Sequence, residues 1–276
     1  MPSVLVTGAS RGIGETIATH LAANGWDVFA GVRTEHDGAR LKAEDARITP
    51  VMLDVTTEKD IAALGDSLPQ RLDAVVNNAA VVVGGPLEAV PVAELRRQLE
   101  VNVVGQIAVT QAVLPRLRAS RGRIVFISSV NGRVSSPLMG PYCASKFALE
   151  AAADALRLEL KPWGIGVVVV EPAQTDTDMW HTTDGVADET AAAMTDDARR
   201  LYEKHFVGLK KTIAMSQKMA VPPENVAAVV EEALTARRPR ARYVVGFVPK
   251  LGLAVLNSLP AGMRDRVVRV VARQPR

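Results

Sequence analysis

The amino-acid sequence predicts an α/β fold: a doubly wound parallel sheet of about seven strands with helices on both faces, in a single domain. Short runs rich in Val, Ile and Leu alternate with helix-length segments along the chain. Such continuous apolar runs are typical of parallel strands that are buried on both faces. No linker rich in Pro, Gly or Ser divides the 276 residues, so we expect one domain over residues 1–276.

Each element follows from its local pattern. The predicted strands are the apolar runs at residues 3–8, 26–32, 48–55, 72–80, 122–129, 165–172 and 241–247. The predicted helices lie at residues 14–25, 37–46, 57–68, 92–118, 142–161 and 222–236. Segment 175–221 is polar and rich in Met, and we expect a mostly helical, substrate-binding flap over the C-terminal ends of the strands, where open α/β sheets bind ligands. Residues 248–276 form a C-terminal extension.

Composition argues against several classes of protein. No apolar run is long enough for a transmembrane helix, and the N-terminus has no basic region typical of a signal peptide. The single cysteine, Cys143, can form no internal disulfide, so we expect a cytoplasmic protein with Cys143 as a small packed thiol. The four histidines are scattered without metal-ligand spacing, so we expect no metal site.

The charge is uneven along the chain. The net charge is +3, yet residues 237–276 contain ten basic residues and one acidic residue. Aromatic residues make up 4% of the chain and form no visible stacking platform. We therefore expect a solvated basic surface at the C-terminal end and no nucleic-acid partner.

A glycine-rich turn, TGASRGIG, joins the first predicted strand to the first predicted helix. Glycines without side chains let the backbone approach a pyrophosphate, and a helix N-terminus offers free N–H groups and a positive dipole end. Because the turn follows a strand in a βαβ pattern, it predicts a Rossmann-type dinucleotide site. The turn supplies Gly8, Ser10, Arg11, Gly12, Ile13 and Gly14.

Two arginines favour NADP(H) over NAD(H), although NAD(H) stays open as the alternative. An NAD site carries an acidic residue at the end of the second strand, where it binds the ribose 2′-hydroxyl. This chain has Arg33 there, and Arg11 lies in the glycine turn. Two guanidinium groups can hold a 2′-phosphate with charge-assisted, forked hydrogen bonds.

Tyr142 and Lys146 are four residues apart in a predicted helix, so they share one helical face. A free tyrosine has a pKa near 10 and is a poor base at neutral pH. A neighbouring ammonium favours the phenolate, so we expect Lys146 to lower the pKa of Tyr142. The pair is therefore a candidate for proton transfer.

Taken together, these motifs resemble the single-domain branch of the short-chain dehydrogenase/reductase family over roughly residues 3–180. They occur in the family's order: Thr7–Gly14, Asp54-Val55, Asn77–Ala80, Asn102, Ser129, Tyr142–Lys146 and Pro172–Thr177. The interval of 13 residues from Ser129 to Tyr142 is the usual one in the family. Two departures are Ala80 and Ala173, where the family usually has glycine. They remove no reacting group, but we expect them to narrow the approach of the backbone to the cofactor.

The resemblance implies a catalytic tetrad of Asn102, Ser129, Tyr142 and Lys146. Tyr142 would exchange a proton with the substrate oxygen, and Ser129 would hydrogen-bond that oxygen. Lys146 would also bind the nicotinamide ribose, and Asn102 would hold a water that links Lys146 to solvent. Ser128 is the competing serine, but neighbouring strand residues face opposite sides, and the spacing favours Ser129.

The resemblance also implies a set of cofactor contacts. Asp54 and Val55 would hold the adenine ring, Asn77 would line the cofactor near the fourth strand, and Thr177 would contact the nicotinamide side. The full predicted set is Gly8, Ser10, Arg11, Gly12, Ile13, Gly14, Arg33, Asp54, Val55, Asn77, Ala79, Tyr142, Lys146, Pro172, Thr175 and Thr177.

The predicted function is hydride transfer between NADP(H) and a hydrophobic ketone or secondary alcohol, such as a steroid-, retinoid- or terpenoid-like molecule. The hydrophobic substrate is expected from adaptable apolar residues after the last motif: Met179, Trp180, Met194, Met215 and Met219. The sequence is similar to the branch with hydroxysteroid and retinol dehydrogenases. Two alternatives are a non-catalytic NADP(H) sensor and a sugar-nucleotide epimerase or dehydratase of the longer branch.

Two partner surfaces are expected. Extension 248–276 could cover the substrate entrance, pack at a subunit interface or make weak contact with an anionic membrane surface, in that order of preference. Family members commonly pair through the long helix and the helix that carries Tyr142, so the resemblance implies a homodimer or homotetramer.

Overall fold

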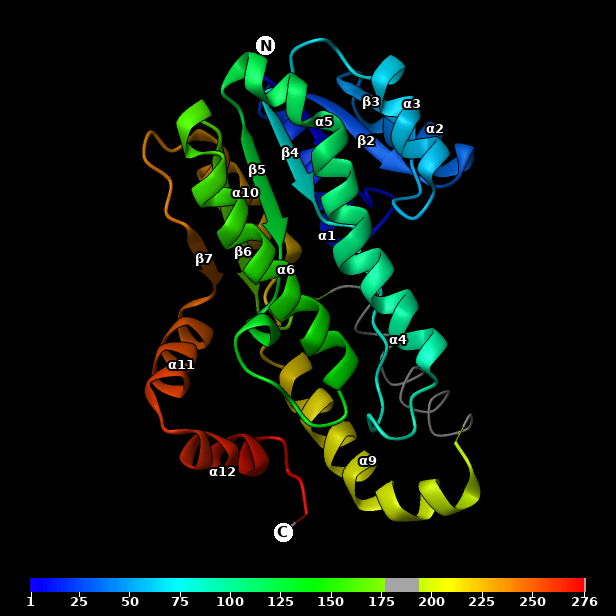
Figure 1. Ribbon diagram of the computed structural model, residues 1–276, viewed down its shortest axis with the longest axis vertical. Coiled ribbons are helices and arrows are strands. Elements are labelled where there is room, and N and C mark those ends of the chain that lie inside the picture. Colours follow the sequence, from blue (N-terminus) through cyan, green and yellow to red (C-terminus); the bar gives the residue numbers. More distant parts are fainter. Residues whose placement is uncertain (177–193, 276) are drawn as a thin grey trace.

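A sheet of seven parallel strands forms the centre of the protein, in a computed structural model that describes residues 1–176 and 194–275. The strands are β1 (Ser3–Val6), β2 (Asp27–Val32), β3 (Ile48–Met52), β4 (Ala74–Asn77), β5 (Arg123–Ile127), β6 (Gly166–Pro172) and β7 (Arg242–Val245). Their order is β3-β2-β1-β4-β5-β6-β7, which confirms the predicted fold class (Figure 1). The winding direction reverses between β1 and β4, and the crevice outside such a switch point is where α/β sheets bind ligands.

Helices cover both faces of the sheet. One face packs against α1 (Gly12–Ala23), α2 (Glu35–Glu44) and α10 (Pro223–Thr235), and the other against α3 (Glu58–Ser67), α5 (Gln106–Ser120) and α6 (Gly140–Glu159). The strands serve both layers because alternate side chains point to opposite faces. In β5, Val125 belongs to the first core and Phe126 to the second, and both are fully buried. Burying a side chain of this size contributes about 1.5–3 kcal/mol.

The helix predicted over residues 92–118 is interrupted. It consists of α4 (Val92–Leu99), a π-helical turn at Glu100–Gly105 and then α5. Gly105 lies so close to the loop after β3 that a Cβ atom there would sit 2.4 Å from the Val55 carbonyl oxygen. The wider turn therefore brings helix backbone against the loop that carries Val55, which an amphipathic pattern does not reveal.

A further layer lies beyond the C-terminal ends of the strands (Figure 1). It contains α9 (Asp196–Gln217), α11 (Phe247–Ser258) and α12 (Ala261–Val271). Helix α9 makes up most of the described part of segment 175–221, and α11 and α12 form most of the C-terminal extension. Two short 3₁₀ turns lie at Val130–Gly132 and Lys161–Trp163. Among the described helices, none is long and apolar enough to cross a bilayer.

Candidate active site

The glycine turn between β1 and α1 needs glycine at each of its three positions. Gly8 and Gly12 have left-handed backbone angles, with φ of +63° and +58°. A Cβ atom at Gly14 would lie 2.2 Å from the Gly8 carbonyl oxygen and 2.4 Å from Nδ2 of Asn78. The turn is therefore closed tightly against β4, and the free N–H groups at the start of α1 are left for an anion.

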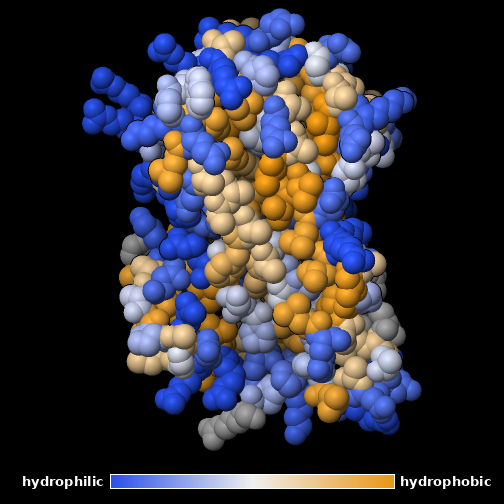
Figure 2. All heavy atoms as spheres, in the orientation of Figure 1, coloured by the Kyte–Doolittle hydropathy of each residue, from blue (hydrophilic) through white to orange (hydrophobic). Residues whose placement is uncertain are grey.

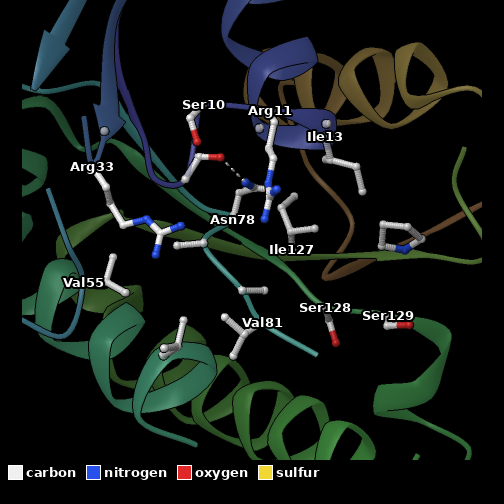
Figure 3. A pocket seen from close by; sticks show the side chains of 18 of the residues that line it. Ser10, Arg11, Ile13, Arg33, Val55, Asn78, Val81, Ile127, Ser128 and Ser129 are labelled. Atoms are coloured by element: carbon white, nitrogen blue, oxygen red, sulfur yellow. Dashed lines mark hydrogen bonds between the residues drawn. The ribbon is translucent and has the colours of Figure 1, made fainter. Parts of the chain in front are cut away.

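A cleft runs from this turn along the C-terminal ends of the strands (Figure 3). Most of the residues predicted to bind a cofactor or to react line it: Gly8, Ser10, Arg11, Gly12, Ile13, Gly14, Arg33, Asp54, Val55, Ala79, Ser129, Tyr142, Lys146, Pro172 and Thr175. Ala80 and Ala173, the two departures from the family pattern, line it as well. Thr177 lies outside the described residues.

Positive charge gathers at one end of the cleft. Arg11 and Arg33 approach from α1 and from the end of β2, and their guanidinium groups extend into the same part of the cleft (Figure 3). Asp54 lies nearby and accepts hydrogen bonds from the Thr56 backbone N–H (2.9 Å) and hydroxyl (2.7 Å). Burial alone would raise the pKa of Asp54, but these bonds and the Arg33 charge hold that pKa below its usual value.

Asn77 does not line the cleft. Its side chain is fully buried under the sheet edge and its Nδ2 donates to the Thr110 hydroxyl at 2.9 Å. The next residue, Asn78, lines the cleft instead and donates to the Thr7 and Gly8 carbonyl oxygens at 3.0 and 3.1 Å. Asn77 is the last residue of β4 and its side chain is turned to Thr110 on α5, whereas Asn78 follows the strand at the edge of the sheet where the cleft lies.

Tyr142, Lys146 and Ser129 meet at the other end of the cleft. The Tyr142 and Ser129 hydroxyls share a hydrogen bond, and the Lys146 ammonium lies 5.7 Å from the centre of the Tyr142 ring. Lys146 is 2% exposed, and its Nζ donates to the Ile127 carbonyl oxygen at 2.8 Å. Ser128 also lines the cleft, but its hydroxyl donates to Glu150 at 2.9 Å rather than to Tyr142. The geometry thus brings together the serine, tyrosine and lysine that the sequence singled out.

The predicted lowering of the Tyr142 pKa is wrong for this structure. Burial raises the pKa of Tyr142 to about 12, and the hydrogen bond with Ser129 offsets only part of that rise. Burial also lowers the pKa of Lys146 to about 8, against the opposing pull of Glu150. Desolvation is the largest cause of both shifts, because both groups are enclosed.

A second cavity, of about 590 Å³, opens beside this end of the cleft. Ser129 and Ala173 line both spaces. The cavity wall is mostly apolar. It comes partly from segment 129–139 and partly from α9, α11 and α12, through side chains such as Ile213, Leu253 and Val268.

The residues predicted to form the substrate wall lie in different parts of the protein. Met219 lines the second cavity, whereas Met194 packs with Leu138 and Phe206 in a separate small core. Met215 is exposed, and its sulfur contacts Arg273. Met179 and Trp180 lie outside the described residues.

Comparison with known proteins identifies the family to which the chain belongs. A model of the short chain dehydrogenase family matches residues 2–186. The chain is 34% identical to an NADPH-dependent 3-dehydrocapnine reductase from Ornithobacterium rhinotracheale, over 97% of this chain and 96% of that protein. The chain belongs to the short-chain dehydrogenase family. It is therefore an oxidoreductase by descent.

Two further comparisons agree with this membership. The chain is 32% identical to mouse retinol dehydrogenase 7, over 96% of this chain and 87% of that protein. A crystal structure of a short-chain dehydrogenase from Streptomyces avermitilis superimposes with a TM-score of 0.76 at 28% identity, and covers 99% of this chain and 95% of that one.

In this short-chain dehydrogenase, Asn102 lies in the π-helical turn, fully buried and outside the cleft lining. Its Oδ1 accepts from the Val81 N–H at 2.8 Å, and its Nδ2 donates to the Val81 carbonyl and the Ser145 hydroxyl at 3.0 and 3.1 Å. The side-chain amide is thus occupied by protein partners. A water that links Asn102 to Lys146 would need the Asn102 backbone carbonyl.

Ser128 contacts an ionic network that the sequence motifs did not indicate. Arg242 on β7 contacts Glu150 at 3.1 Å and Glu171 at 3.3 Å, and also bonds Asp154 at 2.6 Å. Burial and the repulsion of Glu150 raise the pKa of Glu171 to about 7, despite the opposing charges of Arg133 and Arg242. These residues are far apart in sequence, so only the fold brings them together.

Proposed function

We propose that the protein is an NADP(H)-dependent reductase of hydrophobic ketones, which also runs in reverse on the secondary alcohols. The observation that carries this proposal is the junction of the two spaces. The hydrogen-bonded Tyr142 and Ser129 hydroxyls lie where the dinucleotide cleft meets the apolar cavity, and Ser129 borders both. A carbonyl placed there would have a proton donor on one side and a hydride source on the other.

The cofactor assignment rests on fit. The cleft combines a glycine turn with no room for side chains, a helix N-terminus and two cationic side chains, Arg11 and Arg33. These features suit a pyrophosphate and a 2′-phosphate. The bacterial reductase relative, named as NADPH-dependent, supports the same choice. When bound, the nicotinamide supplies the hydride.

The chain's own residues would position the carbonyl and move its proton. Ser129 would donate a hydrogen bond to the substrate oxygen, and Tyr142 would give that oxygen a proton as negative charge develops there. The buried Lys146 ammonium would stabilise the phenolate left behind. The Lys146 Nζ donates a hydrogen bond of 2.8 Å to the Ile127 carbonyl oxygen, and this bond fixes the position of the ammonium.

The protonation state supports reduction as the favoured direction at neutral pH. With a pKa of about 12, Tyr142 keeps its proton and is ready to donate it. Oxidation of an alcohol needs the phenolate as a base, so its rate should rise as pH increases toward that pKa, whereas reduction should not gain from higher pH.

The cavity supports a hydrophobic substrate. Its volume of about 590 Å³ suits a molecule of drug or lipid size, and its wall is mostly aliphatic. Most of the wall belongs to α9 and to the C-terminal extension, so we propose that the extension covers the substrate. Retinol dehydrogenase 7, a relative named for an apolar alcohol, is consistent with this class.

Two partner surfaces complete the proposal. The outer side of α11 and α12 would touch anionic lipid, and the face made by α5 and α6 would pair with a second copy of the chain. The cytoplasmic location and the absence of a nucleic-acid partner stay predictions.

The function is tested with NADPH and a panel of hydrophobic ketones and alcohols, read by nicotinamide absorbance. Tyr142→Phe should lower ketone reduction by about 10²- to 10⁴-fold, because it removes the proton donor. NADPH affinity should stay near that of the wild type. Tyr243→Phe is the matched control, since Tyr243 is equally buried but lies on β7 away from the cleft. A wild-type protein that binds NADPH yet turns over no member of the panel would instead favour a cofactor sensor.

A further inference from the structure

Three fully buried amide side chains line one side of the helix formed by α4, the π-helical turn and α5. They are Gln98, Asn102 and Gln106, each four residues from the next. Opposite them runs segment 79–83, an extended stretch after β4 that has no sheet partner within the described residues. Residues 79–81 of this segment line the dinucleotide cleft.

The amides take the place of a neighbouring strand for this segment. Gln98 accepts from the Val83 N–H at 2.5 Å and donates to the Val81 carbonyl at 2.6 Å. Asn102 bonds both the N–H and the carbonyl of Val81. Gln106 donates to the Ala79 carbonyl at 2.7 Å. The backbone groups at alternate residues 79, 81 and 83 are thus each held by an amide.

The three amides match the backbone groups of segment 79–83 because the repeat distances of the helix and of the extended chain are similar. Four residues of α-helix rise about 6 Å, and two residues of extended chain span about 6.6 Å. A four-residue step also turns about 40° beyond a full helical turn. The wider π-helical turn at Glu100–Gly105 reduces this drift, which keeps the three amides on one side.

The same amides also reach the helix that carries Tyr142. Asn102 donates to the Ser145 hydroxyl at 3.1 Å, and that hydroxyl donates to the Tyr142 carbonyl at 2.7 Å. Gln98 lies 3.5 Å from the same hydroxyl. One cleft wall and the Tyr142 helix are therefore fixed to a single row of side chains.

We propose that Gln98 is a positioning residue for cofactor binding, acting through the backbone of residues 81–83. Val81 lies in the cleft between Arg33 and Ser129 (Figure 3). Without the Gln98 amide, the buried Val83 N–H would lose the partner described above, and an unpaired buried donor is costly. The segment would then move to reach water, and the cofactor would bind only the ordered fraction of molecules. This inference rests on the proposed NADP(H) site.

The first test is Gln98→Leu, which keeps the side-chain size and removes both hydrogen-bonding groups. Equilibrium binding of NADPH, followed by its fluorescence, should weaken about tenfold, in line with the loss of roughly one buried hydrogen bond. Val230→Ala is the control, because it opens a cavity under α10 in the core on the other face of the sheet, which includes no residue of segment 79–83. It should lower the unfolding temperature but leave NADPH affinity unchanged.

The second test is Gln98→Glu at several pH values, and it remains decisive if the leucine variant does not fold. A protonated carboxyl group can accept from the Val83 N–H and donate to the Val81 carbonyl, as the amide does. An ionised carboxylate cannot donate and repels that carbonyl. The described partners of Gln98 are two backbone positions and the Ser145 hydroxyl, none of which titrates near neutral pH.

NADPH affinity of Gln98→Glu, relative to the wild type at the same pH, should therefore be near unity in acid and fall about tenfold or more as pH rises. A constant ratio across pH, or wild-type affinity in both Gln98 variants, would overturn the inference. A wild-type protein that binds no NADPH would overturn the proposed function instead.

Discussion

At the scale of single residues, we propose that Arg33 distinguishes the two nicotinamide cofactors. It stands at the end of β2, where an acidic residue would select NAD(H), and Arg11 faces the same part of the cleft. A 2′-phosphate carries about two negative charges that can pair with the guanidinium groups of Arg11 and Arg33, whereas a ribose hydroxyl carries no charge. The preference therefore depends on charge-assisted bonds that only one cofactor can make.

Arg33→Ala should raise the KM for NADPH by roughly tenfold or more and leave the KM for NADH little changed, since a hydrogen bond to a charged group contributes about 1.5–3 kcal/mol. Steady-state kinetics with both cofactors and one ketone measure the change. Arg47→Ala, an exposed arginine that does not line the cleft, serves as the control. Equal losses with NADPH and NADH would contradict the assignment of Arg33 to the 2′-phosphate.

At the scale of elements, α11 and α12 expose both large apolar and basic side chains. Leu251 is 60% exposed and Val270 is 72% exposed, while Lys250, Arg266 and Arg269 lie on the same two helices and are also exposed. Apolar side chains beside basic ones suit the boundary of an anionic bilayer. The inner side of the pair lines the second cavity, the proposed substrate site. A hydrophobic molecule could therefore pass from lipid to the cavity with little exposure to water.

The protein should sediment with vesicles that contain phosphatidylserine and should be released by high salt. Reversing two charges, Arg266→Glu with Arg269→Glu, should weaken this binding by at least about tenfold, because each basic residue near such a surface contributes about 1 kcal/mol. Arg96→Glu on α4 is the matched reversal away from these helices. Equal sedimentation of both variants, or none for the wild type, would exclude the lipid contact.

At the scale of the whole molecule, we propose that a second copy of the chain packs against the face formed by α5 and α6. Figure 2 shows apolar side chains gathered along this face. Val104, in the turn before α5, is 50% exposed, and Phe147 on α6 is 42% exposed. Ala144, Ala151 and Ala155 continue an exposed stripe of small residues along α6. Small side chains let two helices approach closely, and a two-fold axis would set the stripe against itself.

Ala151→Glu should convert a dimer or tetramer to a smaller species, because it places a charge at the centre of this stripe. Size-exclusion chromatography with light scattering gives the mass directly. Ala43→Glu, on the exposed side of α2, should leave the mass unchanged. A wild-type monomer at micromolar concentration would rule out the pairing.

The sequence predicted the parts of the molecule that depend on local pattern. The apolar runs located all seven strands, and the spacing from Ser129 to Lys146 selected side chains that do meet in space. Prediction from the sequence failed where contacts between side chains from distant segments determine the structure. The pattern could not tell Asn78 from Asn77 at a strand end, and it held no sign of the π-helical turn. The direction of the Tyr142 pKa shift depends on burial, which spacing does not encode.

The position of Arg242 in the sequence affects when the protein can fold during its synthesis. Its guanidinium neutralises carboxylates on α6 and β6, yet it stands near the end of the polypeptide, in the last strand. On the ribosome, those acids are synthesised about seventy to ninety residues before their counter-charge. Arg133, Arg157 and Ser128 contact these acids earlier in the chain, but enclosing carboxylates without their full counter-charge is unfavourable, so we expect the packing around the tyrosine and lysine to be completed only after β7 is made. Premature termination before that arginine would therefore leave the reactive groups present but unsupported.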